Sequence, residues 1–349
     1  MRLSTKQMKP WLSLLLAALL LLPLSGCAKA QDDEWPDTIR IGYLRVPNDE
    51  TIAKAEAIFD DYFTPRGIRC DFIIFDSGVD ANKALLANSI DFATMGDTNG
   101  VIALATGLDV ELIWIHEVLG DAEQLVARRD AGITSIEDLA GRNVATVFAS
   151  TAHFSLLHAL RDAGIEDDVT LLDMQTADIV AAWQRGDIDA AYTWQPTLDE
   201  LLREGVSLVT SLDMAERGVV TANILLARRG FSETYPQLTA DFISALANAG
   251  DLYRDDAAEA AGIAAGELGI TADVAAAQML GSRWLTREEA LSADFMGTSD
   301  QPGHFVQVIL DTAVFLADQS SIERIPSYDE VAAFVNPVYI EQSLEPDDG

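Results

Sequence analysis

Hydrophobic and polar residues alternate along the first third of the chain in a pattern that predicts short strands separated by helices. Four runs have the alternation or apolar content of strands, namely Thr38–Tyr43, Cys70–Phe75, Ile90–Met95 and Val110–Ile115. Three segments between them have apolar residues at helical spacing, namely Asp49–Phe63, Val79–Ala87 and Thr98–Thr106. Strands that alternate with helices are typical of a mainly parallel sheet with helices on both faces.

One motif occurs twice, at Leu86–Asp97 and again at Gln184–Gln195. In both copies an amphipathic run ends at Asn or Gly, and Ile-Asp and a short apolar strand follow. Asn and Gly tolerate the left-handed backbone at the end of a helix. The strand that follows carries its last residues to the carboxyl edge of a sheet, where open α/β folds bind ligands. Two such edges predict two α/β lobes that face a shared cleft.

A second near-repeat, Leu125–Arg129 and Leu225–Arg229, consists of an apolar strand that runs into a basic pair. We interpret the two copies as strands that connect the lobes, and coincidence in a chain rich in Leu, Ala and Arg is the alternative. We therefore expect the first part of lobe 1 at 38–125, lobe 2 at 126–223 and a return to lobe 1 at 224–344. The returning part is expected to be helical from Tyr235 to Phe315, and an acidic tail follows at 345–349.

The amino terminus has the features of a targeting segment. Three basic residues precede the apolar run Leu12–Leu24, which is shorter than the ~20 residues that span a bilayer. The run continues into Leu24-Ser25-Gly26-Cys27, which looks like a bacterial lipobox. We therefore expect a lipoprotein signal peptide at 1–26, lipidation of Cys27 and a polar tether at 27–37, so that the protein is exported and anchored by lipid. An ordinary secretory peptide with an incidental cysteine is the alternative.

The net charge of the chain restricts the classes of partner that it can bind. The formal net charge is -33 at pH 7, which argues against a nucleic acid partner because binding phosphates requires a basic face. Lysine is nearly absent after the apolar run, where only Lys29, Lys54 and Lys83 occur. Acid-rich, lysine-poor surfaces suit high salt, because screening removes most of the repulsion between carboxylates.

Two predicted turns between a strand and a helix offer sites for a charged ligand. Ser150 and Thr151 follow a strand and open a helix, where free backbone N–H groups and the helix dipole favour an anion. The alternative is that Ser150 only caps its helix. Asp97 occupies the equivalent turn near residue 96 and suits either a ligand cation or a helix cap.

The strand at the second copy of the repeated motif ends in aromatic and polar residues. We expect Tyr192 and Trp194 to face opposite sides of this strand, with one of them in the core. Trp194 and Gln195 lie nearer to the strand's end and are the better candidates to line the cleft. The ring of Trp194 would shield a ligand or contact an ammonium group.

Signals for catalysis or metal binding are weak. His116, His153, His158 and His304 show no metal-ligand spacing with cysteines, and the chain has no nucleophile elbow, phosphate loop or dinucleotide fingerprint. With Cys27 lipidated, Cys70 has no disulfide partner, and we interpret it as a half-buried strand residue. We expect neither an enzyme nor a bound cofactor or metal.

The chain resembles the taurine-binding proteins of ABC importers, within the wider group that binds aliphatic sulfonates and nitrate. The likeness runs from about Thr38 to Ser343 and is densest in Phe148–Leu157 and Ile179–Tyr192, with further matches at Phe75–Gly78 and Leu119-Gly120. The resemblance implies an α/β, two-lobed fold of the periplasmic-binding-protein type (type II). Each lobe would be a mainly parallel sheet flanked by helices, and two crossover strands would join the lobes. It also implies a protein that closes over its ligand and delivers it to a permease, with an anion-binding helix start at Ser150 and Thr151 and a cleft aromatic at Trp194.

Departures from the family pattern lie around the expected pocket. Gly96-Asp97-Thr98 replaces Gly-Ser-Ser, Gly120-Asp121-Ala122-Glu123 replaces Gly-Asn-Ser-Glu, and Asn223 replaces an aspartate that suits the taurine amine. Tyr43 keeps its place but Leu44 follows it. The pocket has therefore moved its negative charge or gained one, which leaves both taurine and a more cationic ligand open.

The leading hypothesis is a monomeric, lipid-anchored solute-binding component of an ABC importer for taurine or a related small sulfonate. Ser150 and Thr151 would hold the anionic end, Asp97, Asp121 or Asn223 the amine, and Trp194 would cover the ligand; Tyr43, Thr98 and Gln195 complete the candidate set. The main alternative keeps the fold and the transport role but changes the ligand to another amine, amino acid or zwitterion.

Overall fold

A computed structural model describes residues 35–345 of the chain. The expected signal peptide, Cys27 and most of the tether and tail therefore lie outside the described residues. Residues 36–349 group into one compact unit. Within the described part, no single helix is both long and apolar enough to cross a bilayer. Only α11 (Ala257–Leu268) and α12 (Ala272–Leu280) pass that test together, on length and composition, as a pair bent by 115°.

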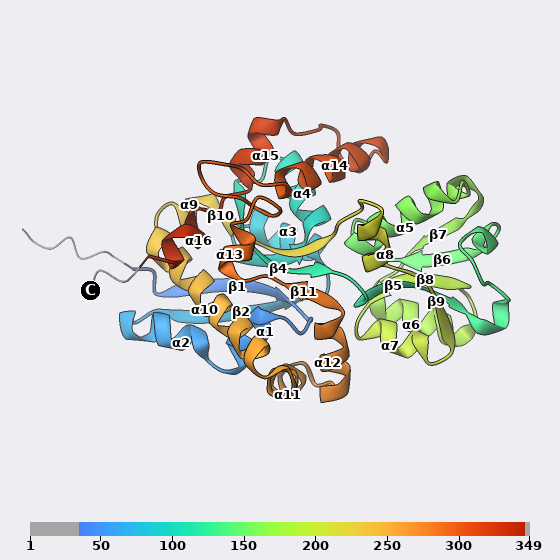
Figure 1. Cartoon of the computed structure of the whole chain (residues 1–349), viewed down its shortest axis with the longest axis horizontal. Helices are drawn as coiled ribbons and strands as arrows, with labels where there is room; N and C mark the ends of the chain where they lie inside the picture. Colours follow the sequence, from blue (N-terminus) through green and yellow to red (C-terminus); the bar gives the residue numbers. More distant parts are fainter. Residues whose placement is uncertain (1–34, 346–349) are drawn as a thin grey trace, which may run out of the picture. The chain divides into compact units, whose positions relative to one another are not determined.

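The first sheet has six strands in the order β11-β4-β10-β3-β1-β2 (Figure 1). Their bounds are β1 (Thr38–Leu44), β2 (Arg69–Phe75), β3 (Phe92–Gly96), β4 (Val110–Leu119), β10 (Ala222–Arg228) and β11 (Ser282–Trp284). β1 pairs in parallel with β2 and β3, whereas β10 lies antiparallel between β3 and β4. The first four strands therefore run in one direction and β10 and β11 run against them.

The second sheet has five strands in the order β7-β6-β8-β5-β9. Their bounds are β5 (Glu123–Arg128), β6 (Asn143–Thr146), β7 (Thr170–Asp173), β8 (Ala190–Trp194) and β9 (Gly205–Thr210). One face packs on α5 (Thr151–Asp162) and α8 (Ser211–Glu216), and the other on α6 (Thr176–Arg185) and α7 (Thr197–Leu202). Leu125 and Val126 point to opposite cores, as successive residues of a strand must.

Both sequence repeats occupy equivalent places in the two sheets. The repeated motif forms α3 (Gly78–Leu86) with β3 and α6 with β8, and both strands lie beside the first strand of their sheet. The near-identical pentapeptides lie in β5 and β10, each of which is the antiparallel strand inserted next to that motif. The interpretation of the pentapeptides as strands that run from lobe to lobe is wrong, because the strand residues of each pair within one sheet only, and Arg129 and Arg229 belong to the helical turns that follow.

The chain changes sheets twice, between Leu119 and Glu123 and again between Thr210 and Ala222. The two crossings lie side by side, since Leu119 N donates to Thr221 O at 2.9 Å. These positions fall near the lobe limits drawn from sequence at 125/126 and 223/224, which stay a prediction.

Two further differences from the sequence expectations concern helices. The segment 49–63 forms two helices, α1 (Asp49–Ala55) and α2 (Ile58–Phe63), because Ala57 adopts a left-handed backbone with φ 55°. The helical last third also contains the short strand β11. Its helices are α9 (Arg229–Ser232), α10 (Pro236–Asp255), α11, α12, α13 (Arg287–Ala290), α14 (Phe305–Asp318), α15 (Tyr328–Phe334) and α16 (Val338–Ser343).

Candidate functional site

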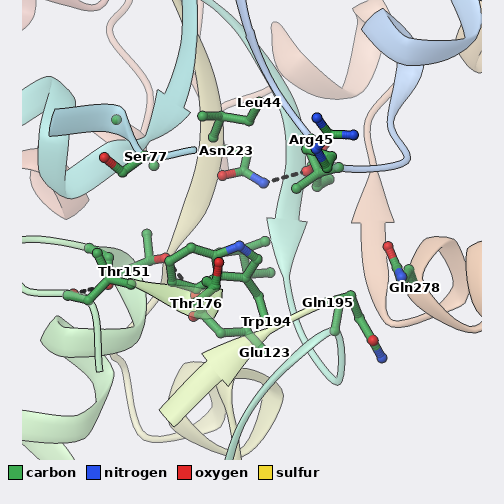
Figure 2. A pocket seen from close by; sticks show the side chains of 18 of the residues that line it. Leu44, Arg45, Ser77, Glu123, Thr151, Thr176, Trp194, Gln195, Asn223 and Gln278 are labelled. Carbon is green, nitrogen blue, oxygen red and sulfur yellow. Dashed lines mark hydrogen bonds between the residues drawn. The ribbon is translucent and has the colours of Figure 1, made fainter. Parts of the chain in front are cut away.

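A cavity with about 1040 Å³ of empty space, part of it open to solvent, is lined by residues of both sheets. Its lining side chains include Leu44, Arg45, Ser77, Asn99, Glu117, Glu123, Phe148, Ser150, Thr151, Thr176, Trp194, Gln195, Asn223, Gln278 and Trp284. In Figure 2, Leu44, Arg45, Ser77 and Asn223 lie along one side of this cavity, and Thr151, Thr176, Trp194 and Gln195 lie along the opposite side. A ligand held here would touch both sheets.

Helices begin around this cavity. Residues at the starts of α3, α4 (Asp97–Ala105), α5 and α6 line it, and each of these helices has nine or more residues. The first N–H groups of a helix have no partner within the helix and carry the positive end of its dipole. Four such ends around one space favour an anion there.

Ser150 and Thr151 line the cavity, but their hydroxyl groups are already engaged. Ser150 Oγ donates to Val147 O at 2.6 Å and accepts from His153 N at 3.2 Å, so Ser150 caps α5. Thr151 Oγ1 donates to Glu123 Oε1 at 2.6 Å. The donors that α5 offers to an anion are therefore backbone N–H groups, and the two hydroxyls orient the turn.

Trp194, Gln195 and Asn223 also line the cavity. The expectation that Tyr192 and Trp194 face opposite sides of β8 is wrong, because residues two apart in a strand share a face. Tyr192 belongs to the core on the α5 side and Trp194 packs against that same core. Trp194 reaches the cavity because it is the last residue of β8, beyond the cover of the helices.

Four sequence candidates do not line this cavity. Asp97 and Thr98 are fully buried at the start of α4, where Thr98 Oγ1 donates to Ala149 O at 3.3 Å. Asp121 is exposed in the first crossing between the sheets. Tyr43 is buried edge-on against Phe72, with ring centroids 6.0 Å apart. The role of these four residues in binding stays a prediction without support from their position.

The cavity contains residues that the sequence reasoning did not single out. Ser77, Glu117 and Glu123 are buried there, with Asn99 at the start of α4. The signal for Glu117 was present in the sequence, because His-Glu follows the apolar stretch 112–115 within β4. Arg45 is exposed and is the only basic side chain in the described lining.

The two cavity glutamates differ in their surroundings. Glu123 accepts hydrogen bonds from Thr151 on one oxygen and from Ser211 on the other. Glu117 Oε1 accepts from Asn223 Nδ2 at 2.6 Å, whereas its Oε2 has no partner among the described residues. Burial raises the pKa of both carboxyl groups to about 7.

A buried network lies next to Glu117 on the first sheet. His116 Nδ1 and Trp114 Nε1 contact the two carboxylate oxygens of Asp49 at 2.5 and 2.8 Å. Thr94 Oγ1 lies 2.9 Å from His116 Nε2 and donates to Glu50. Burial alone would lower the pKa of His116, but the charge of Asp49 and the hydrogen bond to it raise it to about 9. Burial raises the pKa of Glu50 to about 7.

The thiol of Cys70, the cysteine within the described residues, lies away from the cavity and its buried carboxyl groups. Cys70 is in β2 and does not line the cavity, and burial raises its pKa to about 12. A thiolate nucleophile is therefore disfavoured at this position. Within residues 35–345, no group of three or more His, Cys, Asp or Glu side chains has the arrangement of a metal site.

One amide bridges the two sides of the cavity. Asn99 Nδ2, from the start of α4, donates to Ala149 O at 3.0 Å in the turn before α5. Ala149 has a left-handed backbone with φ 63°, a strained conformation for alanine that this contact helps to hold.

Asn99→Ala is expected to weaken binding of taurine, the ligand expected from the sequence, about fivefold, because one hydrogen bond across the cavity is worth roughly 1 kcal/mol. Titration calorimetry would measure the change. Asn248→Ala serves as the matched control, since Asn248 Nδ2 donates to Tyr62 OH on an exposed surface and does not line the cavity. Equal affinities for the two variants would contradict the bridging role.

Comparison with known proteins identifies the family of this chain. The sequence matches the NMT1/THI5-like family over residues 55–260, more than half of the chain. The taurine-binding periplasmic protein of Escherichia coli K12 is 28% identical over 301 residues, which cover 82% of this chain and 88% of that protein. These findings confirm the family resemblance seen in the sequence.

Two solved structures share the fold. The aliphatic sulphonate binding protein SsuA from Escherichia coli has a TM-score of 0.71 and 21% identity, over 88% of this chain and 100% of that chain. The desulfurization enzyme DszB has a TM-score of 0.63 and 20% identity, over 88% and 99% of the two chains. The two-sheet α/β architecture is thus the periplasmic-binding-protein fold, and the chain belongs to the NMT1/THI5-like family.

Proposed function

We propose that this protein is the extracytoplasmic solute-binding component of an ABC importer, and that it binds taurine or a related small sulfonate in the cavity between its two sheets. The observation that carries the proposal is the meeting of four helix starts, from both sheets, around one cavity. A sulfonate keeps its negative charge at any physiological pH and has three oxygens to accept hydrogen bonds, so it suits several converging N–H groups. The taurine-binding relative supports the same ligand class.

Ser77 adds a donor to this arrangement. Its side chain makes no capping hydrogen bond at the start of α3, although it is buried and lines the cavity. Arg45 contributes positive charge at the rim. The anion site is therefore built mainly from backbone N–H groups and hydroxyls, which bind without requiring a buried cation.

Transport follows from how the ligand connects the two sheets. A ligand that contacts both sides stabilises the closed arrangement over an open one, and the closed form presents the cargo to a permease. The leader and Cys27 support export and a lipid anchor, with the protein acting as a monomer outside the cytoplasm.

The position of the thiol supports binding without catalysis. DszB shows that this fold also occurs in an enzyme. Cys70 is outside the cavity and its thiol is held protonated by burial, so no cysteine among residues 35–345 faces a ligand. We therefore infer a binding protein.

A second ligand class is another amine, amino acid or zwitterion, and one observation supports its ammonium group. Glu117 and Glu123 place two buried carboxyl groups in the cavity wall. Such a ligand would keep the fold and the transport role and change only the anionic group.

Titration calorimetry on the full chain in mild detergent tests the proposal. We expect one-to-one binding of taurine at micromolar or lower Kd, and weaker binding of an amino acid such as β-alanine, whose carboxylate has one oxygen fewer than a sulfonate. Tight binding of β-alanine with no heat from any sulfonate would overturn the sulfonate assignment and favour the second class.

A further inference from the structure

Glu117 occupies a special place in the cavity wall. In β4 it pairs directly with Trp284 of β11 and with Asn223 of β10. Directly opposite residues of paired strands project to the same face, so the carboxyl group has an indole on one side and an amide on the other. All three side chains line the cavity.

The carboxyl group of Glu117 is only half satisfied. It is 4% exposed, and Asn223 occupies Oε1 while Oε2 has no partner in the described part of the chain. A buried carboxylate oxygen without a partner is costly, and a cation that arrives with the ligand would remove this cost. Glu123 does not bear this cost, because each of its oxygens already accepts a hydrogen bond.

The charges around Glu117 keep it available for a cation. The nearby charged groups are His116 on its own strand and Asp49 and Glu50 of α1. His116 is committed to Asp49 and Thr94, and no basic side chain forms an ion pair with Glu117 among the described residues. Arg45 shares the cavity without such a pair. The site therefore has an unpaired acid beside an aromatic ring, the combination that recognises ammonium groups.

Resting on the proposed function, we propose that Glu117, oriented by Asn223 and flanked by Trp284, is the ammonium anchor of the cavity and restricts the ligand to aminosulfonates. The sulfonate lies at the helix starts and the ammonium group donates to Glu117 Oε2. This arrangement also explains why Asn223 suffices near the second crossing, since its amide orients the acid and does not itself carry the charge. A sulfonate with an alkyl or hydroxyl group in place of the amine would leave Oε2 unpaired.

The test compares taurine with 2-hydroxyethanesulfonate, in which a neutral hydroxyl replaces the ammonium group, by calorimetry on the full chain in mild detergent. We expect the unmodified protein to prefer taurine at least tenfold. Glu117→Gln keeps the bond from Asn223 and removes the charge. It should weaken taurine binding at least tenfold and change the affinity for 2-hydroxyethanesulfonate less than threefold.

Glu56→Gln is the matched control, because it makes the same change at an exposed acid that does not line the cavity, and we expect it to bind both ligands normally. Equal binding of both sulfonates by the unmodified protein overturns the ammonium anchor and leaves the sulfonate function standing. Unchanged taurine binding by a folded Glu117→Gln variant likewise overturns the ammonium anchor and leaves the sulfonate function standing. Absence of binding to either sulfonate overturns the proposed function together with this inference. If the Glu117→Gln variant does not fold, the preference of the unmodified protein for taurine over 2-hydroxyethanesulfonate still tests the ammonium anchor.

Discussion

Gly96→Ala is expected to weaken taurine binding by roughly tenfold to a hundredfold, because it overpacks the contact between the two sides of the cavity. A Cβ at Gly96 would lie 2.8 Å from Thr151 Cγ2, nearer than two carbon atoms can pack. Gly96 has φ -65° and ψ 148°, which alanine adopts freely, so the effect comes from the collision and not from backbone strain. Thr151 cannot turn away without breaking its hydrogen bond to Glu123.

A second substitution makes this prediction specific. Thr151→Ser removes the Cγ2 methyl group and keeps the hydroxyl, so the double variant should regain most of the lost affinity in a double-mutant cycle. Gly266→Ala in α11 is the control, since a Cβ there meets no atom within 4 Å. Calorimetry with taurine measures five proteins, namely the unmodified protein, the two single variants, the double variant and the Gly266→Ala control. Full affinity in Gly96→Ala, or no rescue by Thr151→Ser, would show that close approach of these two residues is not needed for binding.

The free energy of unfolding is expected to fall by on the order of 7 kcal/mol between pH 6.5 and pH 9. Burial raises the folded-state pKa of Glu50, Glu117 and Glu123 to about 7 and that of Asp97 to about 8. His116 has a folded-state pKa of about 9 because the charge of Asp49 outweighs the effect of burial.

The direction of this change in stability follows from the number of protons that the folded and unfolded chains bind. All five groups hold protons more tightly in the folded chain than in the unfolded chain, so raising the pH through their folded-state pKa values favours unfolding. The stabilisation from His116 is complete below its unfolded pKa near 6.5 and is lost as the pH approaches 9. Burial lowers the pKa of His153 to about 4 and also lowers that of His158; both act in the opposite sense, but below pH 6.5.

Chemical denaturation at several pH values checks this prediction, with and without 1 M sodium chloride. The net charge of -33 makes surface repulsion grow with pH as well, but salt screens exposed charges and leaves buried groups largely unaffected. The loss of stability should therefore persist in high salt. Stability that is constant or rises from pH 6.5 to 9 in high salt would contradict the buried-acid description.

The two-sheet architecture could be predicted because its signals are local. Hydrophobic period and turn residues identified nearly every strand of the first sheet, and the repeated motif marked β3 and β8 as equivalent. The break at Ala57 was missed because nothing in 49–63 demands it except packing of the finished fold. β11 was missed because three residues are too few to show a period.

The residues that line the cavity were only partly predictable, because strand register and the positions of helix starts determine which side chains face it. Trp194 was found because it ends a strand at the expected edge, and Asn223 because it replaces an aspartate of the family pattern. For Asp97 the sequence left a ligand contact and a helix cap open, and here its carboxylate faces its own helix, accepting from Thr98 N at 2.8 Å. The sequence shows Glu117 as a polar residue in a mainly apolar strand. Its pairing with Asn223 and the contact of Asn99 with Ala149 join segments far apart in sequence, which no local pattern reveals.

A crystal structure of the protein with bound taurine tests the central claim most directly. The account predicts one taurine in the cavity, with its sulfonate at the starts of α3, α4, α5 and α6 and its ammonium group within hydrogen-bond distance of Glu117. Taurine bound outside this cavity, or bound inside it with the sulfonate against Glu117, would contradict the account.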